Sequence, residues 1–222
     1  MKQLYFTPES IDLKARELLS NINVTQNRGR SSFVPDHSAL LILDMQSYFL
    51  DESSHAFVPS AKAIIPRLVA LAAAYRTKDL PVIFTQHLNT QQDAGLMATW
   101  WRELILADHP LSQIVADFDL SGCPVVNKSQ YDAFFRTSLE TVLRELEVNQ
   151  VVISGVMTHL CCETTARSAF MHGFEAFFLA DGTATYNEAF HLSSLINLSH
   201  GFASLKLVSD IQSCLSEIAP DA

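Results

Sequence analysis

The sequence lacks the features on which several classes of protein depend. Its 15 Lys and Arg residues are outnumbered by 24 Asp and Glu residues, and the formal net charge of −9 leaves no basic footprint for a nucleic acid. No apolar run approaches the ~20 residues that a membrane span needs. Residues 1–6 lead at once into Thr-Pro-Glu-Ser, where a secretory signal would have an apolar core. We therefore expect a cytoplasmic protein without nucleic-acid or membrane partners.

Glycine, proline and cysteine are also scarce. Seven glycines and eight prolines among 222 residues argue against a disordered or low-complexity chain. The four cysteines are Cys123, Cys161, Cys162 and Cys214, and no CxxC pair occurs among them. Adjacent Cys161 and Cys162 are poor disulfide partners. The cysteine pattern therefore indicates a reducing compartment, with neither a disulfide framework nor a zinc site.

The sequence does have ample material for a core, because 48% of its residues are hydrophobic and only 18% are charged. Apolar runs alternate with amphipathic segments, which favours one α/β domain whose mainly parallel sheet is covered on both faces. We expect strands at 39–44, 81–86, 124–127, 151–154, 177–180 and 204–208, and helices at 59–78, 138–147, 161–172, 189–201 and 209–217. This domain spans 38–217, after an N-terminal helix and polar arm at 7–22 and 23–37 and before a tail at 218–222.

Three residues whose side chains could take part in catalysis end these expected strands or follow them. Asp44 closes the first strand, Lys128 follows the third, and Cys161 lies at the turn between the fourth strand and the next helix. The carboxyl ends of parallel strands share one edge of a sheet, so an acid, a base and a thiol can converge there. The start of a helix also favours thiolate over thiol. Each residue taken singly is more simply a cap, a solvated Lys or a core Cys, but the three together favour a nucleophilic site.

The segments around these residues carry a family resemblance. Residues 41–49 (LILDMQSYF), 127–134 (NKSQYDAF) and 155–161 (GVMTHLC) resemble the isochorismatase-like cysteine hydrolases, and the resemblance extends from about residue 39 to about 211. It implies a Rossmann-like, three-layer αβα sandwich with a six-stranded sheet in an order similar to 3-2-1-4-5-6. It also implies a catalytic triad of Asp44, Lys128 and Cys161 that hydrolyses an amide or imide.

The same resemblance implies the local geometry of the site. A cis peptide bond is expected between Val156 and Met157, and the backbone amides of Met157 and Cys161 are expected to form an oxyanion hole. Cys162 is expected to point into the core, about 100° further around the helix. An ordinary strand end at Gly155-Val156-Met157 remains the alternative.

Metal binding is not expected. Members of the nicotinamidase type hold a metal through a DxHxxH-like cluster, and this sequence has none. Asp51 and His55 have the wrong spacing, while His87 and His109 are isolated along the chain. We therefore predict an enzyme without a metal or any other cofactor.

Substrate-binding side chains are expected at strand ends and among aromatic residues near them. The candidates are Gln46, Phe49, Gln86, Trp100, Tyr131, Thr158 and His159, with Trp101 and Phe134 as further candidates for the pocket wall. A core or subunit contact explains the aromatic residues equally well, and His159 also suits a hydrogen-bonded turn. Specificity is expected to lie in residues 87–122, where the patterning is weakest.

Three functions follow from these observations. The first is a cysteine hydrolase that cleaves a small amide-like C–N bond through a thioester, with a small molecule as its partner and a homodimer or homotetramer as its assembly. The second is isochorismatase-type hydrolysis of a vinyl ether, in which Asp44 acts as a general acid and the thiol is not needed. The third is a non-catalytic binding protein on the same fold.

Overall fold

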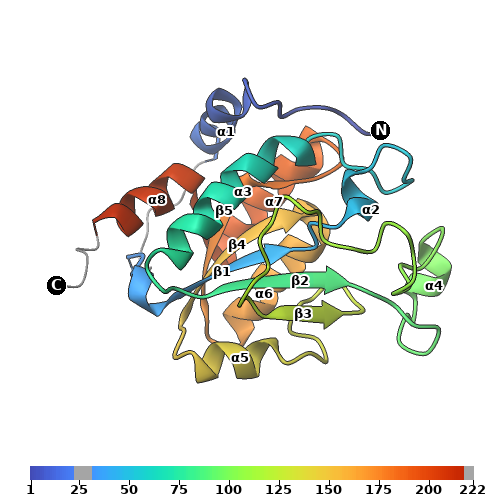
Figure 1. Ribbon diagram of the computed structural model, residues 1–222. Helices are drawn as coiled ribbons and strands as arrows, with labels where there is room; N and C mark the ends of the chain where they lie inside the picture. The colour runs from blue at the N-terminus through green and yellow to red at the C-terminus, as the bar shows by residue number, and fades with distance from the viewer. Residues whose placement is uncertain (23–31, 218–222) are drawn as a thin grey trace.

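The centre of the computed structural model, which describes residues 1–22 and 32–217, is a six-stranded sheet (Figure 1). Its strands lie in the order β3-β2-β1-β4-β5-β6, and every neighbouring pair is parallel. They are β1 (Ser38–Leu43), β2 (Val82–His87), β3 (Val125–Lys128), β4 (Gln150–Val156), β5 (Glu175–Ala184) and β6 (Ala203–Lys206). The Rossmann-like architecture and the strand order expected from the sequence are confirmed.

Helices form a layer on each face of the sheet (Figure 1). One layer holds α1 (Ile11–Ser20), α3 (Ala61–Arg76) and α8 (Val208–Ser216), and the other holds α5 (Leu139–Glu145), α6 (Glu163–Met171) and α7 (Glu188–Gly201). Shorter elements lie in the connections: α2 (Ser47–Leu50), α4 (Met97–Trp100), the 3₁₀ turn η1 (Pro35–His37) and the π-helical turn η2 (Thr158–Cys162). Among the described residues, no helix combines the length and apolarity needed to cross a bilayer.

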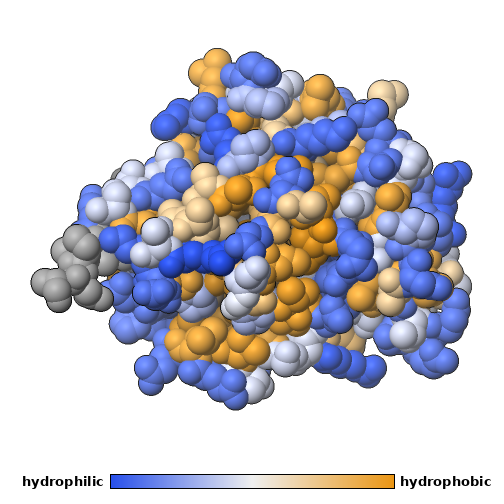
Figure 2. All heavy atoms as spheres, in the orientation of Figure 1, coloured by the Kyte–Doolittle hydropathy of each residue, from blue (hydrophilic) through white to orange (hydrophobic). Residues whose placement is uncertain are grey.

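Burial explains why the central strands read as continuous apolar runs. Every residue of β1 and of β4 is buried, because helices cover both faces of these two strands. The edge strand β3 instead alternates between exposed and buried residues. On the face shown in Figure 2, polar side chains line the rim and apolar ones gather toward the middle.

Two elements differ from their expected bounds because polar side chains find partners. Strand β5 continues past residue 180, since the Asp181 carboxylate accepts a hydrogen bond from the Val208 amide at 2.7 Å and pairs with Arg67 at 2.9 Å. Helix α1 begins at Ile11 and not at Thr7, because Ser10 Oγ accepts from the Thr7 amide at 3.0 Å and closes a separate turn. Residues 23–31 of the expected arm and the expected tail at 218–222 lie outside the described part of the chain.

Strands β1 and β4 leave no room for a side chain at Gly155, which pairs with Leu43. The glycine has φ of +102°, and a Cβ atom there would lie 2.1 Å from the Leu43 carbonyl oxygen. Only glycine fits this position, because the clash is with backbone that cannot turn aside. The two segments that carry the candidate site begin just beyond, at Asp44 after β1 and at Met157 after β4.

Replacing Gly155 by alanine is expected to destabilise the fold strongly. The strained φ and the backbone clash together predict a loss of about 3 kcal/mol or more in the free energy of unfolding. Gly173→Ala is the matched control, since Gly173 also has positive φ, +81°, but its Cβ would meet nothing within 4 Å. The control is expected to lose about 1 kcal/mol. Urea unfolding of both variants measures the difference, and equal losses would contradict the close approach.

Candidate active site

The strand order brings the ends of four neighbouring strands together at one edge of the sheet. Asp44 follows β1, His87 ends β2, Lys128 ends β3, and Cys161 lies in η2 just after β4. Chain connections leave β1 and β4 in opposite directions, so this edge is the switch point at which ligands bind in such sheets. The three residues singled out by the sequence therefore meet, together with a histidine that was thought isolated.

Lys128 is the centre of the group. Its Nζ lies 2.8 Å from Asp44 Oδ2, and both side chains are fully buried. The same ammonium donates to Cys161 Sγ at 3.3 Å and to the Gln130 carbonyl oxygen at 2.9 Å. One cation thus connects the acid to the thiol.

Asp44 is held in place from two directions. Its backbone has φ of +53°, a left-handed conformation that turns the chain sharply after β1. Its Oδ1 accepts a hydrogen bond from Thr85 Oγ1 at 2.6 Å, and the Asp44 amide donates back to that hydroxyl at 3.2 Å. Within the described chain, Oδ2 has the ion pair with Lys128 but no aligned hydrogen bond. That oxygen is therefore free to accept a proton.

Burial controls the protonation of the thiol and the amine. Burial raises the pKa of Cys161 to about 12, and the Lys128 ammonium opposes this only in part. Burial alone would lower the pKa of Lys128, but the Asp44 charge and the hydrogen bonds to Asp44 and Cys161 raise it to about 12. Cys161 therefore rests as a thiol, and the thiolate expected from the helix start is not supported. The reason is that the loss of hydration outweighs the nearby positive charge.

His87 is a site residue that the sequence analysis missed. It pairs in register with Lys128 across β2 and β3, and its Nδ1 lies 3.3 Å from Lys128 Nζ. Its Nε2 lies 3.1 Å from Asn89 Oδ1. Burial and then the Lys128 charge lower the pKa of His87 to about 4, so the ring is neutral and Nδ1 accepts from the ammonium. Its place at the end of an expected strand was the available signal.

Asp44, His87 and Cys161 also form a possible ligand set for a metal ion, with ligand atoms within 4.8 Å of one another. The Lys128 ammonium, however, already lies 2.8 Å from the Asp44 carboxylate and 3.3 Å from both the His87 ring and the Cys161 sulfur. A divalent ion placed among the same three groups would meet this charge directly. The group suits a protonated lysine better than a metal.

The turn that carries Cys161 has an unusual backbone. The peptide bond between Val156 and Met157 is cis. The Met157 carbonyl oxygen accepts from the amides of Leu160 at 3.0 Å and Cys162 at 3.2 Å. The Cys162 thiol points the other way, into the core, where its Sγ lies 3.8 Å from the Ser154 carbonyl oxygen. Of the two adjacent thiols, only Cys161 faces Lys128.

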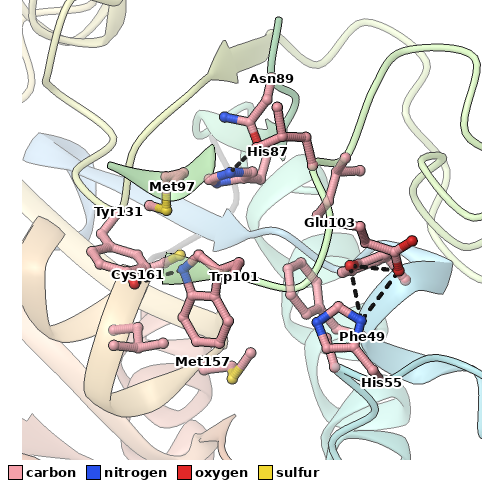
Figure 3. A pocket seen from close by; sticks show the side chains of 15 residues that line it. Phe49, His55, His87, Asn89, Met97, Trp101, Glu103, Tyr131, Met157 and Cys161 are labelled. Carbon is pink, nitrogen blue, oxygen red and sulfur yellow. Dashed lines mark hydrogen bonds and ion pairs between the residues drawn. The ribbon is translucent and has the colours of Figure 1, made fainter. Parts of the chain in front are cut away.

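Cys161 lies at a cavity with mainly apolar walls (Figure 3). Phe49, Met97, Trp101 and Tyr131 supply much of the wall, and Trp101 Nε1 donates to the Tyr131 hydroxyl at 2.9 Å. The complete lining comprises Tyr48, Phe49, His55, Ala56, His87, Asn89, Met97, Trp101, Glu103, Leu104, Ile105, Tyr131, Met157, Leu160 and Cys161. Such a cavity suits a small, flat substrate whose carbonyl reaches the thiol.

Two of the seven expected substrate-binding residues, Phe49 and Tyr131, line this cavity. Trp100 lies outside it with 79% of its surface exposed, and the neighbouring Trp101 takes its place in the wall. Gln46 is buried, and its side chain bonds the backbone of β2 and of a loop: its Oε1 accepts from the His87 amide at 2.7 Å, and its Nε2 donates to the Ser112 carbonyl oxygen at 2.6 Å.

The remaining expected residues also bond elsewhere. Gln86 donates to the same Ser112 carbonyl oxygen, at 2.9 Å. Thr158 Oγ1 lies 3.0 Å from His191 Nδ1, while His159 bonds Thr185 and stacks on Phe190. Phe134, a further candidate for the wall, stacks on His172 and Phe174. Their polar atoms and rings hold the scaffold around the cavity and do not line it.

Comparison with known proteins adds family information to this geometry. A family model described as the isochorismatase domain matches residues 38–209. The chain is 38% identical to Nicotinamidase 3 of Arabidopsis thaliana, over 76% of this chain and 83% of that protein. It is 34% identical to Enterobactin synthase component B of Escherichia coli (strain K12), over 82% of this chain, and it spans 65% of the length of that relative.

Solved structures agree on the fold. The cysteine hydrolase from Pseudomonas syringae pv. phaseolicola 1448A superposes with a TM-score of 0.82 at 22% identity, covering 86% of this chain and 98% of that one. The pyrazinamidase of Pyrococcus horikoshii, solved in complex with zinc, has a TM-score of 0.71 at 23% identity, covering 77% and 99%. At these identities the likeness concerns the arrangement of helices and strands.

A buried histidine behind the site predicts how stability depends on pH. His191 Nε2 donates to the Ala180 carbonyl oxygen at 3.0 Å, and Nδ1 lies 3.1 Å from the Tyr5 hydroxyl and 3.0 Å from the Thr158 hydroxyl. Burial lowers the pKa of His191 to about 4, well below the ordinary value for histidine of about 6.5. The unfolded chain therefore binds this proton first as the pH falls. We expect the free energy of unfolding to decrease from about pH 6.5 toward pH 4.

Urea unfolding between pH 7.5 and 4.5 measures this slope. The slope of the unfolding free energy against pH reports how many more protons the unfolded chain binds. His191→Asn is expected to lower that number by up to one, even if the variant is less stable throughout. His200→Asn is the matched control, since His200 is exposed near the end of the same helix, and it is expected to keep the slope of the unchanged protein. Identical slopes in all three proteins would contradict a neutral, buried His191.

Proposed function

The chain belongs to the isochorismatase family of hydrolases, and on that premise we propose that it cleaves the C–N bond of a small amide through a thioester on Cys161. The observation that carries the proposal is the buried contact of Lys128 with both Asp44 and Cys161, at the end of an apolar cavity. The similarity to a nicotinamidase, whose name denotes an amide hydrolase, supports the same reaction.

The first step makes the nucleophile. Because Cys161 rests as a thiol, its sulfur needs a base at the moment of attack. Asp44 Oδ2 takes the Sγ proton while Sγ forms a bond to the amide carbonyl carbon. Lys128 stays protonated and stabilises the sulfur as negative charge develops on it. His87, as a neutral acceptor, fixes the direction of the Lys128 ammonium.

The carbonyl oxygen becomes an oxyanion in this step. The amides of Met157 and Cys161 are the proposed donors that stabilise it. The neighbouring Leu160 and Cys162 amides are engaged by the Met157 carbonyl oxygen, so they do not compete for this role.

The tetrahedral intermediate then collapses and the C–N bond breaks. Asp44 gives the proton it holds to the leaving nitrogen, which departs as ammonia or an amine, and a thioester remains on Cys161. Asp44 next takes a proton from a water molecule that attacks the thioester carbon. Collapse of the second intermediate releases the carboxylic acid product and returns the proton to the sulfur.

Hydrolysis of a vinyl ether by Asp44 alone is the second candidate function, supported by the match to a family model described as the isochorismatase domain. The charge of the cavity lining disfavours this function. Isochorismate carries two carboxylates, which need cationic partners, and no Lys or Arg is among the described residues that line the cavity. Glu103 would instead repel a dianion. A purely binding protein, the third candidate, gives no role to a thiol held against a buried ion pair.

Replacement of the nucleophile tests the mechanism. A screen of small amides, ureas and isochorismate on the purified protein identifies a substrate, and Cys161→Ala is then expected to lose at least ~10³-fold in kcat. Cys162→Ala is the matched control, expected to keep most of the activity because that thiol faces Ser154 in the core. Circular dichroism checks that both variants fold. Turnover of isochorismate by Cys161→Ala, lost in Asp44→Asn, would establish the vinyl-ether function instead.

A further inference from the structure

The cavity contains a second polar group that the proposed mechanism does not use. Tyr48, His55 and Glu103 line it, and His55 and Glu103 lie on the side away from Cys161 (Figure 3). The Tyr48 hydroxyl donates to Glu103 Oε1 at 3.0 Å, and His55 Nδ1 lies 3.2 Å from the same oxygen. These three residues come from α2, the loop after it and the loop before β3, so only the folded chain brings them together.

The hydrogen bonds within this cluster leave one oxygen of the Glu103 carboxylate without a partner. Glu103 Oε1 already receives the Tyr48 hydroxyl and the His55 ring, while in the part of the chain described no partner lies against Glu103 Oε2 or His55 Nε2. The oxygen of the Glu103 carboxylate that has no partner selects a ligand group that donates hydrogen bonds.

The charge at this end of the cavity is negative. A hydrogen bond from Tyr48, and then those from His55 against some burial, lower the pKa of Glu103, so its carboxylate is ionised at neutral pH. The titratable groups that face it are Tyr48, His55 and His109, and none of the described lining residues is Lys or Arg. The carboxylate, 48% exposed, therefore has no permanent cation of its own.

We propose that Glu103 binds a cationic or N–H-bearing group on the substrate, remote from the amide that Cys161 attacks. This inference rests on the proposed amide hydrolysis and narrows its substrate class. The aromatic side chains of Phe49 and Trp101 lie between the two ends (Figure 3), so the substrate is a flat ring with a carboxamide at one side and an amino-type nitrogen at the other. Tyr48, only 3% exposed, positions Glu103 through the hydrogen bond from its hydroxyl.

Matched pairs of amides test the preference. 4-(Aminomethyl)benzamide and 4-ethylbenzamide have the same shape but differ by one positive charge, and the 3-substituted pair covers the other ring geometry. The unchanged protein is expected to show kcat/KM at least about tenfold higher for one of the two cationic amides than for its neutral counterpart. Equal values within both pairs would overturn the inference and leave amide hydrolysis intact.

Glu103→Gln assigns the preference to the carboxylate. Glutamine keeps an oxygen for the Tyr48 hydroxyl but removes the charge, so KM for the cationic amide is expected to rise about tenfold while KM for the neutral amide changes less than twofold. Glu52→Gln is the matched control, because Glu52 is an exposed acid beyond α2 that pairs with Lys62 and does not line the cavity. A preference unchanged in Glu103→Gln would overturn the assignment.

A binding measurement separates this inference from the proposed reaction. Calorimetric titration of Cys161→Ala with the cationic and neutral amides needs no turnover. Tighter binding of the cationic amide, lost when Glu103→Gln is added, supports the recognition site even if no amide is hydrolysed. Absence of any amide hydrolysis by the unchanged protein refutes the proposed function alone, whereas equal binding of both amides refutes the inference alone.

Discussion

The buried ion pair between Lys128 and Asp44 is the interaction on which the site depends. Removing two charges from water costs several kcal/mol per ion, and that cost is offset only when both groups are close and otherwise well bonded. Here the two atoms lie 2.8 Å apart, Thr85 bonds the acid, and the Gln130 carbonyl oxygen bonds the amine. These partners come from the ends of β1, β2 and β3, so the pair ties the edge of the sheet together.

The ion pair also explains how a buried cysteine can react. Burial raises the pKa of Cys161 far above neutrality, so the sulfur does not exist as a free thiolate at rest. A thiol of this kind is protected from oxidants and metals and becomes nucleophilic only when a base removes its proton. In the proposed mechanism Asp44 takes that proton, and Lys128, with its Nζ 3.3 Å from Sγ, stabilises the charge that remains. On this proposal, activation is confined to the moment when a carbonyl occupies the cavity.

The sequence predicted the parts of this arrangement that follow from strands and their ends. Asp44, Lys128 and Cys161 each adjoin an apolar run, and parallel strands bring such positions to one edge, so both the sheet and the meeting of the three could be foreseen. His87 has the same kind of position, but its expected strand was ended one residue early. Gln46 also lies close to the end of a strand, but its side-chain amide bonds the backbone of His87 and Ser112. No local sequence pattern predicts these contacts.

The rest of the cavity depends on tertiary contacts in residues 88–122, which contain only one short helix. The Asn89 amide donates to the Ile105 carbonyl oxygen at 2.7 Å, and the Tyr48 amide donates to that of Leu111 at 2.8 Å. In this segment Trp101 and not Trp100 enters the wall, and Glu103 meets His55. Neither periodicity nor composition carries that information, because the segment has no regular repeat from which to infer its faces.

Covalent capture of the substrate tests the central claim most directly. The protein is mixed with an amide that it hydrolyses, quenched in acid within the first turnovers, and digested for mass spectrometry. The account predicts an acyl group on the peptide containing Cys161 and Cys162, retained in Cys162→Ala and absent in Cys161→Ala. Steady hydrolysis by the unchanged protein with no acyl adduct, and full hydrolysis by Cys161→Ala, would contradict it.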